Sequence, residues 1–334
     1  LLVQQHDAMR IKYEINDEKV KQIIEEQNYN CFDIFEKEVS FKQDIEEFIL
    51  AETENLQKDI SINNGKLIKI GLFRTEESDF LFIAVHHLII DGVSWRILLS
   101  DMYDIYSRLL DGEEDILIPK SASFMDYSRE LYKIAEKLQP LDTIWSEIED
   151  KEIDTIGEEK ADFRYESRDS SEREIILSSQ LTKNLLDIRK DSCSPDMGDI
   201  LAGVLSLVLN KQNDMKHFLI NMEYHGRKCK SLTNDYSNTI GWFTTIYPLV
   251  VDVSDVENIE DFINDLAVEN HNYRDYAVEY GILKYIKHQE DSIFNVKSEI
   301  CINYLGEFDN VVKNELFTYS NIKTFDNFSD KQHK

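Results

Sequence analysis

An apolar run that ends in two histidines and leads into a helical pattern is the feature that most constrains this chain. Residues 80–85 (Phe-Leu-Phe-Ile-Ala-Val) are aromatic, aliphatic and partly β-branched, which is typical of a buried strand. Apolar residues then recur at helical spacing over residues 93–109, and Asp91 is placed to cap the first turn. The sequence therefore predicts a strand-to-helix junction that carries His86 and His87.

The two histidines are expected to have different surroundings. Successive side chains along a strand point to opposite faces, so one imidazole is predicted to be buried and hydrogen-bonded while the other faces a cavity. Adjacent histidines alone would indicate only a core residue beside a surface residue. The pattern His-His-x-x-x-Asp-Gly over residues 86–92, followed by Ser94-Trp95, is more specific.

This pattern resembles the signature of the condensation-domain superfamily of nonribosomal peptide synthetases, whose fold is like that of chloramphenicol acetyltransferase. In that family the second histidine is the active-site residue and the aspartate mainly supports the loop. The resemblance implies these roles for His87 and Asp91, with His86 and Gly92 in support. A shorter form of the motif occurs in other acyltransferases, so it indicates the superfamily and not the reaction.

Three later segments resemble motifs of the epimerization subtype, in the family's order and at compatible separations. Residues 222–227 (Met-Glu-Tyr-His-Gly-Arg) are similar to its Glu-Gly-His-Gly-Arg motif, with Tyr224 in place of the first glycine. Residues 239–248 contain Thr-Ile-Gly-Trp-Phe-Thr, and residues 302–309 contain Asn-Tyr-Leu-Gly-Glu-Phe-Asp. Ordinary condensation domains usually lack the first two motifs, so the resemblance implies an epimerization domain.

His87 and Glu223 are implied to be an acid/base pair that removes a proton from one face of a carbon and returns it to the other. Their direction is left open. Further residues are expected to support the glutamate or to line a substrate cleft: His225 and Arg227 in the first role, and Asn303, Tyr304, Trp242 and Phe243 in the second.

The implied substrate is an aminoacyl or peptidyl thioester on the phosphopantetheine arm of a carrier protein. The α-proton of a thioester is a weak acid, and a positioned acid or base typically gives about 10²–10⁴-fold. The enolate oxygen needs stabilisation, for which cleft polar groups and the amides of the helix after Asp91 are candidates. Because only protons move, no metal or organic cofactor is expected. The expected partners are a peptidyl carrier protein and neighbouring synthetase modules.

Three departures from the family pattern are visible, and none removes a proposed catalytic side chain. Asn238 stands where an arginine commonly precedes the Thr-Ile-Gly-Trp-Phe segment, and a glycine-rich stretch is replaced by residues 277–281 (Ala-Val-Glu-Tyr-Gly). Tyr224 adds bulk beside the proposed catalytic glutamate. Each departure is expected to affect substrate scope or activity.

Composition narrows the possible partners and location. The 334 residues carry a formal charge of −28, which argues against nucleic acid or an anionic membrane as a partner because both are polyanions. The longest apolar helix candidate, residues 200–209, is too short to span a bilayer. Four widely separated cysteines show no disulfide or zinc pattern, so reduced thiols and a cytoplasmic location are expected. They are Cys31, Cys193, Cys229 and Cys301.

Mixed helical and strand patterns in two successive halves fit the superfamily's pseudo-dimer, an α/β (mixed α+β) fold of two lobes around a central cleft or tunnel. We expect one lobe over residues 1–150, a charged linker or solvated helix over 151–171, and a second lobe over 172–334. The family's opening and closing segments are expected to be missing. Strands are predicted at residues 67–73, 80–85, 174–177, 218–223, 245–253 and 300–304, and helices after Asp91 and at 124–138, 181–189, 199–211 and 259–271.

Three other functions stay open at this point. A condensation domain would form a peptide bond between two carrier-bound substrates and would not require Glu223. An inactive remnant would only dock carrier proteins. A free-standing acyltransferase would use coenzyme A, and the absence of neighbouring carrier or adenylation modules would favour it.

Overall fold

The computed structural model describes residues 1–16, 19–26, 30–39, 44–114, 116, 121–139, 144–148, 151–157, 171–188, 195–287, 298–307, 316–320 and 322. Two compact units are present, and neither is continuous in sequence. Unit 1 contains the described parts of Leu1–Arg129, Asn234–Phe243 and Gly306–Phe328. Unit 2 contains the described parts of Glu130–Thr233 and Thr244–Leu305.

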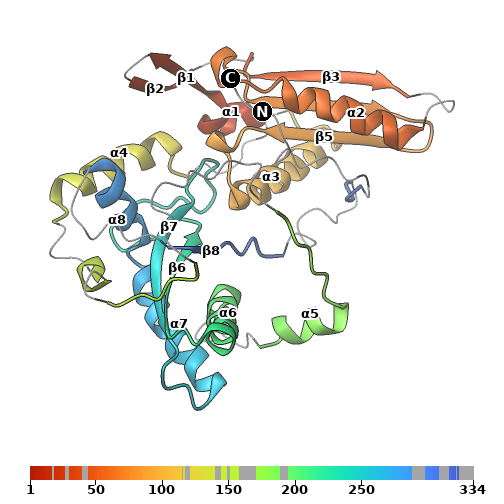
Figure 1. Cartoon of the computed structure of the whole chain (residues 1–334). Coiled ribbons are helices and arrows are strands. Elements are labelled where there is room, and N and C mark those ends of the chain that lie inside the picture. Colours follow the sequence, from red (N-terminus) through yellow and green to blue (C-terminus); the bar gives the residue numbers. More distant parts are fainter. Residues whose placement is uncertain are drawn as a thin grey trace. The chain divides into compact units, whose positions relative to one another are not determined.

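Unit 1 is built on a three-stranded sheet in the order β3-β4-β5. β3 (Phe32–Glu38) runs parallel to β4 (Ile68–Arg74), which pairs antiparallel with β5 (Asp79–Val85). α2 (Ile45–Lys58) connects β3 to β4 and packs on this sheet, as Figure 1 shows. The helix begins at Asp44, whose carboxylate accepts a first-turn amide hydrogen at 3.2 Å.

The core between α2 and the sheet contains the buried side chains of Val39, Ile49 and Phe73. Gly71 allows the helix to approach closely. A Cβ atom there would lie 2.9 Å from the Phe73 ring and 3.0 Å from the side chain of Leu56. Burial of an aromatic side chain such as Phe73 contributes roughly 1.5–3 kcal/mol, so this small core anchors the helix.

The remaining elements of unit 1 do not belong to this sheet. They are α1 (Leu2–Gln5), η1 (Asp7–Arg10), the antiparallel hairpin β1 (Ile11–Asn16) and β2 (Lys19–Ile24), η2 (Ile62–Asn64), η3 (His87–Ile89) and α3 (Gly92–Leu110). α4 (Phe124–Lys137) begins in unit 1 and ends in unit 2.

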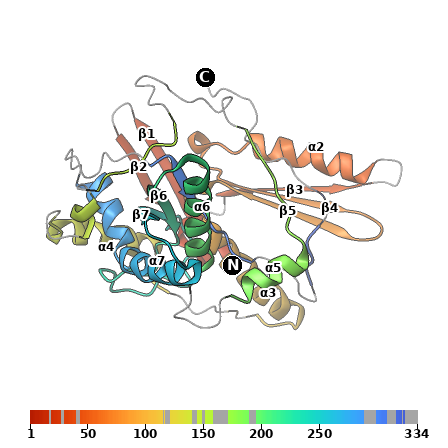
Figure 2. The same cartoon turned by 60° about the horizontal axis from the view of Figure 1, so that its bottom comes forward.

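Unit 2 also contains a three-stranded sheet, in the order β7-β6-β8. β6 (His217–Tyr224) pairs antiparallel with β7 (Thr245–Asp252) and parallel with β8 (Ile300–Ile302). α6 (Met197–Asn213) and α7 (Ile259–Arg274) pack on each other and on the sheet (Figure 2). The other elements of unit 2 are η5 (Ile144–Ile148), α5 (Ser179–Leu186), α8 (Ala277–Gly281) and the π-helical turn η7 (Ile282–Ile286).

The core of unit 2 is centred on Trp145, which is 0% exposed. Its ring lies 5.4 Å from that of Tyr273, 5.2 Å from that of Tyr280 and 6.2 Å from that of Tyr247, measured between centroids. These residues come from η5, α7, α8 and β7, so aromatic packing joins four elements of the unit.

Most of the predicted elements are confirmed to within a few residues. The strands at 67–73, 80–85, 218–223 and 245–253 and the helices at 124–138, 199–211 and 259–271 are present, as is the helix that Asp91 caps. The helix predicted at 181–189 is α5, and the strand predicted at 300–304 ends at Ile302.

The strand predicted at 174–177 is wrong. These residues pair with no strand in the described part of the chain, and Ile175 and Ile176 are 84% and 83% exposed. An apolar, β-branched run fits a pleated surface, but it becomes a strand only where a neighbour supplies hydrogen bonds.

The two compact units do not follow the order of the predicted lobes. Asn234–Phe243 belongs to unit 1, where the amide of Ala122 donates to the carbonyl of Asp235 at 3.3 Å. The described residues between 130 and 148, which the sequence predicts in the first lobe, pack in unit 2. Residues 158–170 of the proposed linker lie outside the described residues. Among the residues that are described, no helix has the length and hydropathy needed to cross a bilayer.

Candidate active site

The two motif histidines lie just beyond the end of β5, at the strand-to-helix junction that the sequence predicts. The His86 amide donates to the carbonyl of Leu67 at 2.8 Å, and its Nδ1 accepts the amide hydrogen of Leu88 at 3.2 Å, which starts the turn η3. The different surroundings of the two side chains therefore come from this turn. His86 is half-buried, and burial, together with the neighbouring His87, lowers its pKa. His87 is exposed.

Asp91 joins the histidine motif to the Gly-Trp-Phe motif. Its carboxylate is buried, and one oxygen accepts the amide hydrogen of Ser94 at 2.8 Å, which caps α3. The other oxygen accepts the amide hydrogen of Phe243 at 3.0 Å. A charge-assisted hydrogen bond of this kind is stronger than a neutral one. One side chain thus fixes both the helix start and a segment that is distant in sequence.

Ser94 makes a second connection between the same two motifs. Its hydroxyl donates to the carbonyl of Gly241 at 2.9 Å and accepts the amide hydrogen of Gly241 at 3.0 Å. The position of Gly241 allows no side chain, since a Cβ atom would lie 2.2 Å from the ring of Phe124. The glycine of this motif is therefore required by close packing.

Trp242 and Phe243 point in different directions and have different environments. The indole of Trp242 is 43% exposed, and its ring centroid lies 5.2 Å from that of His87 with the planes tilted by 54°. Phe243 is buried, with its ring 4.5 Å from Tyr127 and 5.7 Å from Tyr236. Trp242 is the member of the pair that lies against the proposed catalytic imidazole.

Glu223 lies one residue before the end of β6, in unit 2. The register pairs Asn221 with Cys301 and Met222 with Ile302, so Asn221, Glu223 and Cys301 share one face of the sheet. The Sγ atom of Cys301 lies 3.9 Å from Oε1 of Glu223, to which it donates. Burial and the Glu223 carboxylate raise the pKa of the Cys301 thiol.

A tight turn follows Glu223. Gly226 has a φ of 62°, and the Arg227 amide donates to Nδ1 of His225 at 3.1 Å. The Arg227 guanidinium also donates to the carbonyl of His225 at 3.2 Å, and Arg227 is buried. The Tyr224 ring lies 4.0 Å from that of His225, so the residue that departs from the family pattern packs within this turn.

The third motif follows β8. Asn303 and Tyr304 are exposed. Gly306 has a φ of 77°, and a Cβ atom there would lie 2.5 Å from the guanidinium of Arg96. Residues 308 and 309 of this motif lie outside the described residues.

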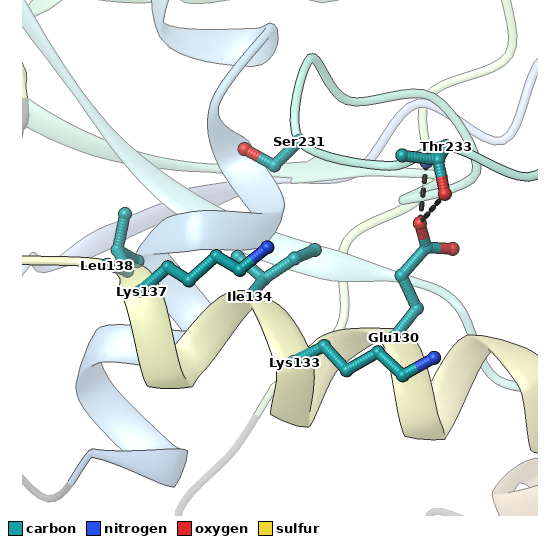
Figure 3. A pocket seen from close by; sticks show the side chains of 7 residues that line it. All are labelled: Glu130, Lys133, Ile134, Lys137, Leu138, Ser231 and Thr233. Atoms are coloured by element: carbon teal, nitrogen blue, oxygen red, sulfur yellow. Dashed lines mark hydrogen bonds between the residues drawn. The ribbon is translucent and has the colours of Figure 1, made fainter.

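A cavity of about 400 Å³ in unit 2 contains none of the predicted site residues (Figure 3). The Glu130 carboxylate on one side accepts the amide hydrogen of Thr233 at 2.6 Å. The Ser231 hydroxyl on the same loop donates to Glu279, whose pKa burial raises. Glu279 is one of the residues that replace the family's glycine-rich stretch. The lining residues are Glu130, Lys133, Ile134, Lys137, Leu138, Ser231 and Thr233.

Ser94 and Cys301 were not among the predicted site residues. Ser94 follows shortly after the histidine motif. Its place in the first turn of the predicted helix could have indicated that its side chain has a structural role. Cys301 comes beside Glu223 only through the register of two parallel strands, which the sequence does not reveal. Among the described residues, no group of three or more His, Cys, Asp or Glu side chains is placed to hold a metal ion.

The sequence matches the model of one protein family, described as "Condensation domain", over residues 1–333. Bacitracin synthase 2 of Bacillus licheniformis is 30% identical over 332 residues, covering 99% of this chain and 13% of that protein. Tyrocidine synthase 1 of Brevibacillus parabrevis is 30% identical over 329 residues, covering 96% of this chain and 30% of that protein. The chain therefore spans less than a third of either relative.

Solved structures agree with this match. The epimerization domain from the third module of tyrocidine synthetase B superposes with a TM-score of 0.80 at 29% identity, covering 96% of this chain and 73% of that one. The condensation domain of the monacolin K polyketide synthase MokA superposes with a TM-score of 0.62 at 14% identity, covering 87% of this chain and 66% of that one, which shows the fold alone. The chain belongs to the condensation-domain family of nonribosomal peptide synthetases.

Proposed function

We propose that this domain epimerizes the Cα of an aminoacyl or peptidyl thioester that a carrier protein presents on its phosphopantetheine arm. The observation that carries the proposal is the similarity to an epimerization domain, at 29% identity and a TM-score of 0.80. The Glu-x-His-Gly-Arg and Gly-Trp-Phe-Thr motifs support it. Condensation is the alternative, because the matching family model describes condensation domains in general.

In the proposed reaction, His87 and Glu223 act as acid and base at the two faces of Cα. One group removes the α-proton, the electrons move into the thioester carbonyl to form an enolate, and the other group returns a proton to the opposite face. Each such group contributes about 10²–10⁴-fold. The chain's own side chains therefore accept the proton that leaves Cα and supply the proton that returns.

The enolate oxygen needs donors that are already in place. The first turn of α3 is the proposed source, since amides at a helix start favour negative charge. The amide of Ser94 is used by Asp91, and that of Trp95 donates to the Asp91 carbonyl at 3.1 Å. This leaves the amides of Gly92 and Val93 as the proposed donors at this helix end.

The proposed partners are the carrier protein that delivers the thioester and the neighbouring synthetase modules, in the cytoplasm. The two named relatives are several times longer than this chain, which is the expected setting for such partners. The phosphopantetheine arm arrives with the substrate, and no resident cofactor is proposed.

The test uses the synthetase that contains this domain, with an L-aminoacyl or peptidyl thioester on its carrier. The released acid is analysed for chirality, and a second loaded carrier is then added to detect amide formation. D product without amide, lost in Glu223→Gln and His87→Ala, is the expected result. Amide formation that survives Glu223→Gln would overturn the proposal in favour of condensation, and neither product from a folded protein would favour a docking role.

Two matched control variants distinguish the loss of a catalytic group from a general loss of folded structure. Glu257→Gln changes an exposed carboxylate of unit 2, and His271→Ala changes an exposed imidazole of α7. Both variants are expected to keep the full rate, because neither side chain belongs to the proposed site.

A further inference from the structure

Ser94 is a buried side chain that holds a whole peptide unit. It is 0% exposed, and its hydroxyl both donates to and accepts from the backbone of Gly241, at 2.9 and 3.0 Å. A hydroxyl can do both at once, whereas a methyl group can do neither. Removing it would leave a buried amide and a buried carbonyl without this partner, and unpaired polar groups in a protein interior are destabilising.

The residue between the two clamped positions is Trp242. Ser94 fixes the backbone of Gly241 on one side, and the Asp91 carboxylate fixes the amide of Phe243 on the other. The backbone of Trp242 is therefore held at both ends, which sets the direction of its Cα–Cβ bond. All of these residues belong to unit 1.

The clamped tryptophan lies against the proposed catalytic histidine. The rings of Trp242 and His87 are 5.2 Å apart between centroids, a separation at which aromatic rings attract each other. His87 is exposed, and it therefore depends on its neighbours for a defined side-chain orientation. Proton transfer requires an approach of about 2.6–3.2 Å between heavy atoms, and a misplacement of about 1 Å can cost about 10²-fold.

We propose that Ser94 is a positioning residue: it clamps the Gly241 peptide so that the Trp242 indole fixes the orientation of the His87 imidazole. Ser94 touches neither the substrate nor His87, and it acts through Trp242. The consequence for catalysis rests on the epimerase function proposed above, whereas the consequence for the orientation of His87 does not.

The first test observes His87 directly and needs no turnover. In protein labelled with ¹³C-histidine, the His87 ring signals are assigned by their loss in His87→Ala. The ring current of Trp242 displaces them in the wild type. Trp242→Ala is expected to move the signals toward the position of a free imidazole, and Ser94→Ala is expected to move them in the same direction. Ser100→Ala, an exposed serine on the same helix, is the matched control and is expected to leave them in place.

The second test uses the rate at which the L thioester on the carrier is converted to the D form, a reaction that requires both His87 and Glu223. Ser94→Ala is expected to lower kcat by about 10- to 100-fold with little change in KM, because orientation and not binding is lost. Ser94→Cys, which keeps a weak donor and acceptor, is expected to recover part of the rate. In the Trp242→Ala background, Ser94→Ala is expected to add little further loss, because the two residues act in series.

His87 signals that stay in place in Ser94→Ala, or losses that add fully in the double variant, would overturn the proposal. If Ser94→Ala does not fold, Ser94→Cys takes its place in both tests, and the same two results decide. Moved His87 signals in a protein without epimerization activity would refute the epimerase function and leave the positioning role standing. If the wild type is active but the His87 signals do not move in Ser94→Ala, the positioning role would be refuted and the epimerase function would stand.

Discussion

Asp91 is the residue on which the site depends most directly. A carboxylate that is 2% exposed accepts amide hydrogens from the first turn of α3 and from Phe243, and thereby holds together two motifs that the sequence separates. Replacing a buried acceptor of this kind with a donor lowers the free energy of unfolding, because a backbone N–H group is left without its partner. Asp91, Ser94 and Gly241 form the rigid base on which the side chains of His87 and Trp242 are presented.

Asp91→Asn tests how much the Asp91 carboxylate contributes to the stability of the fold. The amide side chain keeps the shape but places an N–H group against one of the two backbone donors. We expect a loss of about 1–3 kcal/mol in the free energy of unfolding, measured by urea denaturation. Asp104→Asn on the exposed side of α3 is the control. Equal midpoints for the two variants would contradict the proposed importance of Asp91.

The Cys301 thiol reports on Glu223. Its pKa is raised by burial and by the Glu223 carboxylate, and only the thiolate reacts with iodoacetamide. In Glu223→Gln the pKa of the thiol falls, so labelling of Cys301 near pH 8 is expected to become about two- to tenfold faster. Peptide mapping by mass spectrometry distinguishes this cysteine from the others. A rate unchanged by Glu223→Gln, or equal to that in Glu257→Gln, would show that the two side chains do not interact.

Gly306 and Gly112 form a matched pair for the third motif. Both have positive φ, of 77° and 81°, so an alanine at either position carries about 1–2 kcal/mol of backbone strain. A Cβ atom at Gly306 would also lie 2.5 Å from the Arg96 guanidinium, whereas none of the described atoms lies within 4 Å of a Cβ at Gly112. Because the guanidinium is the far end of a flexible side chain and can move, we expect Gly306→Ala to lower the free energy of unfolding only slightly more than Gly112→Ala, by the cost of displacing Arg96. Equal losses would exclude a steric role for Arg96.

Among the elements of unit 2, a buried hydrogen-bond chain links β7, α7 and α6. The Tyr247 hydroxyl donates to Oδ1 of Asn270 at 2.7 Å, and the Asn270 amide donates to Oδ1 of Asp199 at 2.6 Å. Burial and the nearby Asp196 carboxylate raise the pKa of Asp199 to about 6. The folded protein therefore holds this proton more tightly than the unfolded chain does.

This shift predicts how stability depends on pH. A raised folded-state pKa contributes stability that is present below about pH 4 and is lost as the pH rises through about 6. The free energy of unfolding of the wild type, relative to that of Asp199→Asn, is therefore expected to fall by on the order of 2 kcal/mol between pH 4 and pH 7. Chemical denaturation at several pH values measures this difference. A difference that does not change with pH, as expected for exposed Asp265→Asn, would contradict the assignment.

Elements with a clear period could be predicted from the sequence, while those that depend on a distant neighbour could not. β5, α3 and α7 could be predicted because each carries its own apolar pattern, and α3 also has its cap at Asp91. The strand expected at 174–177 was wrong because it has no pairing partner among the described residues. β3 was missed because it is an edge strand whose Ile34 is 62% exposed among charged neighbours, so its pattern does not distinguish it from a loop.

At the scale of the whole molecule, four motifs were sufficient to predict the family, which the family model over residues 1–333 confirms. The capping role of Asp91 could also be predicted, since a cap depends on local sequence. The bonds from Asp91 and Ser94 to residues 241–243 could not be predicted, because they depend on how distant segments pack. The subtype depends on chemistry, namely on whether His87 and Glu223 act as the proposed acid/base pair.

The roles of His87 and Glu223 can be measured by α-proton exchange in D₂O, followed by mass, with the carrier loaded separately with the L and the D thioester. If the two groups act on opposite faces of Cα, deuterium uptake into both substrates is expected in the wild type. His87→Ala is expected to lose deuterium exchange into one of the two thioesters. Glu223→Gln is expected to lose exchange into the other. Exchange from neither substrate, or variants that behave like Glu257→Gln, would contradict the account.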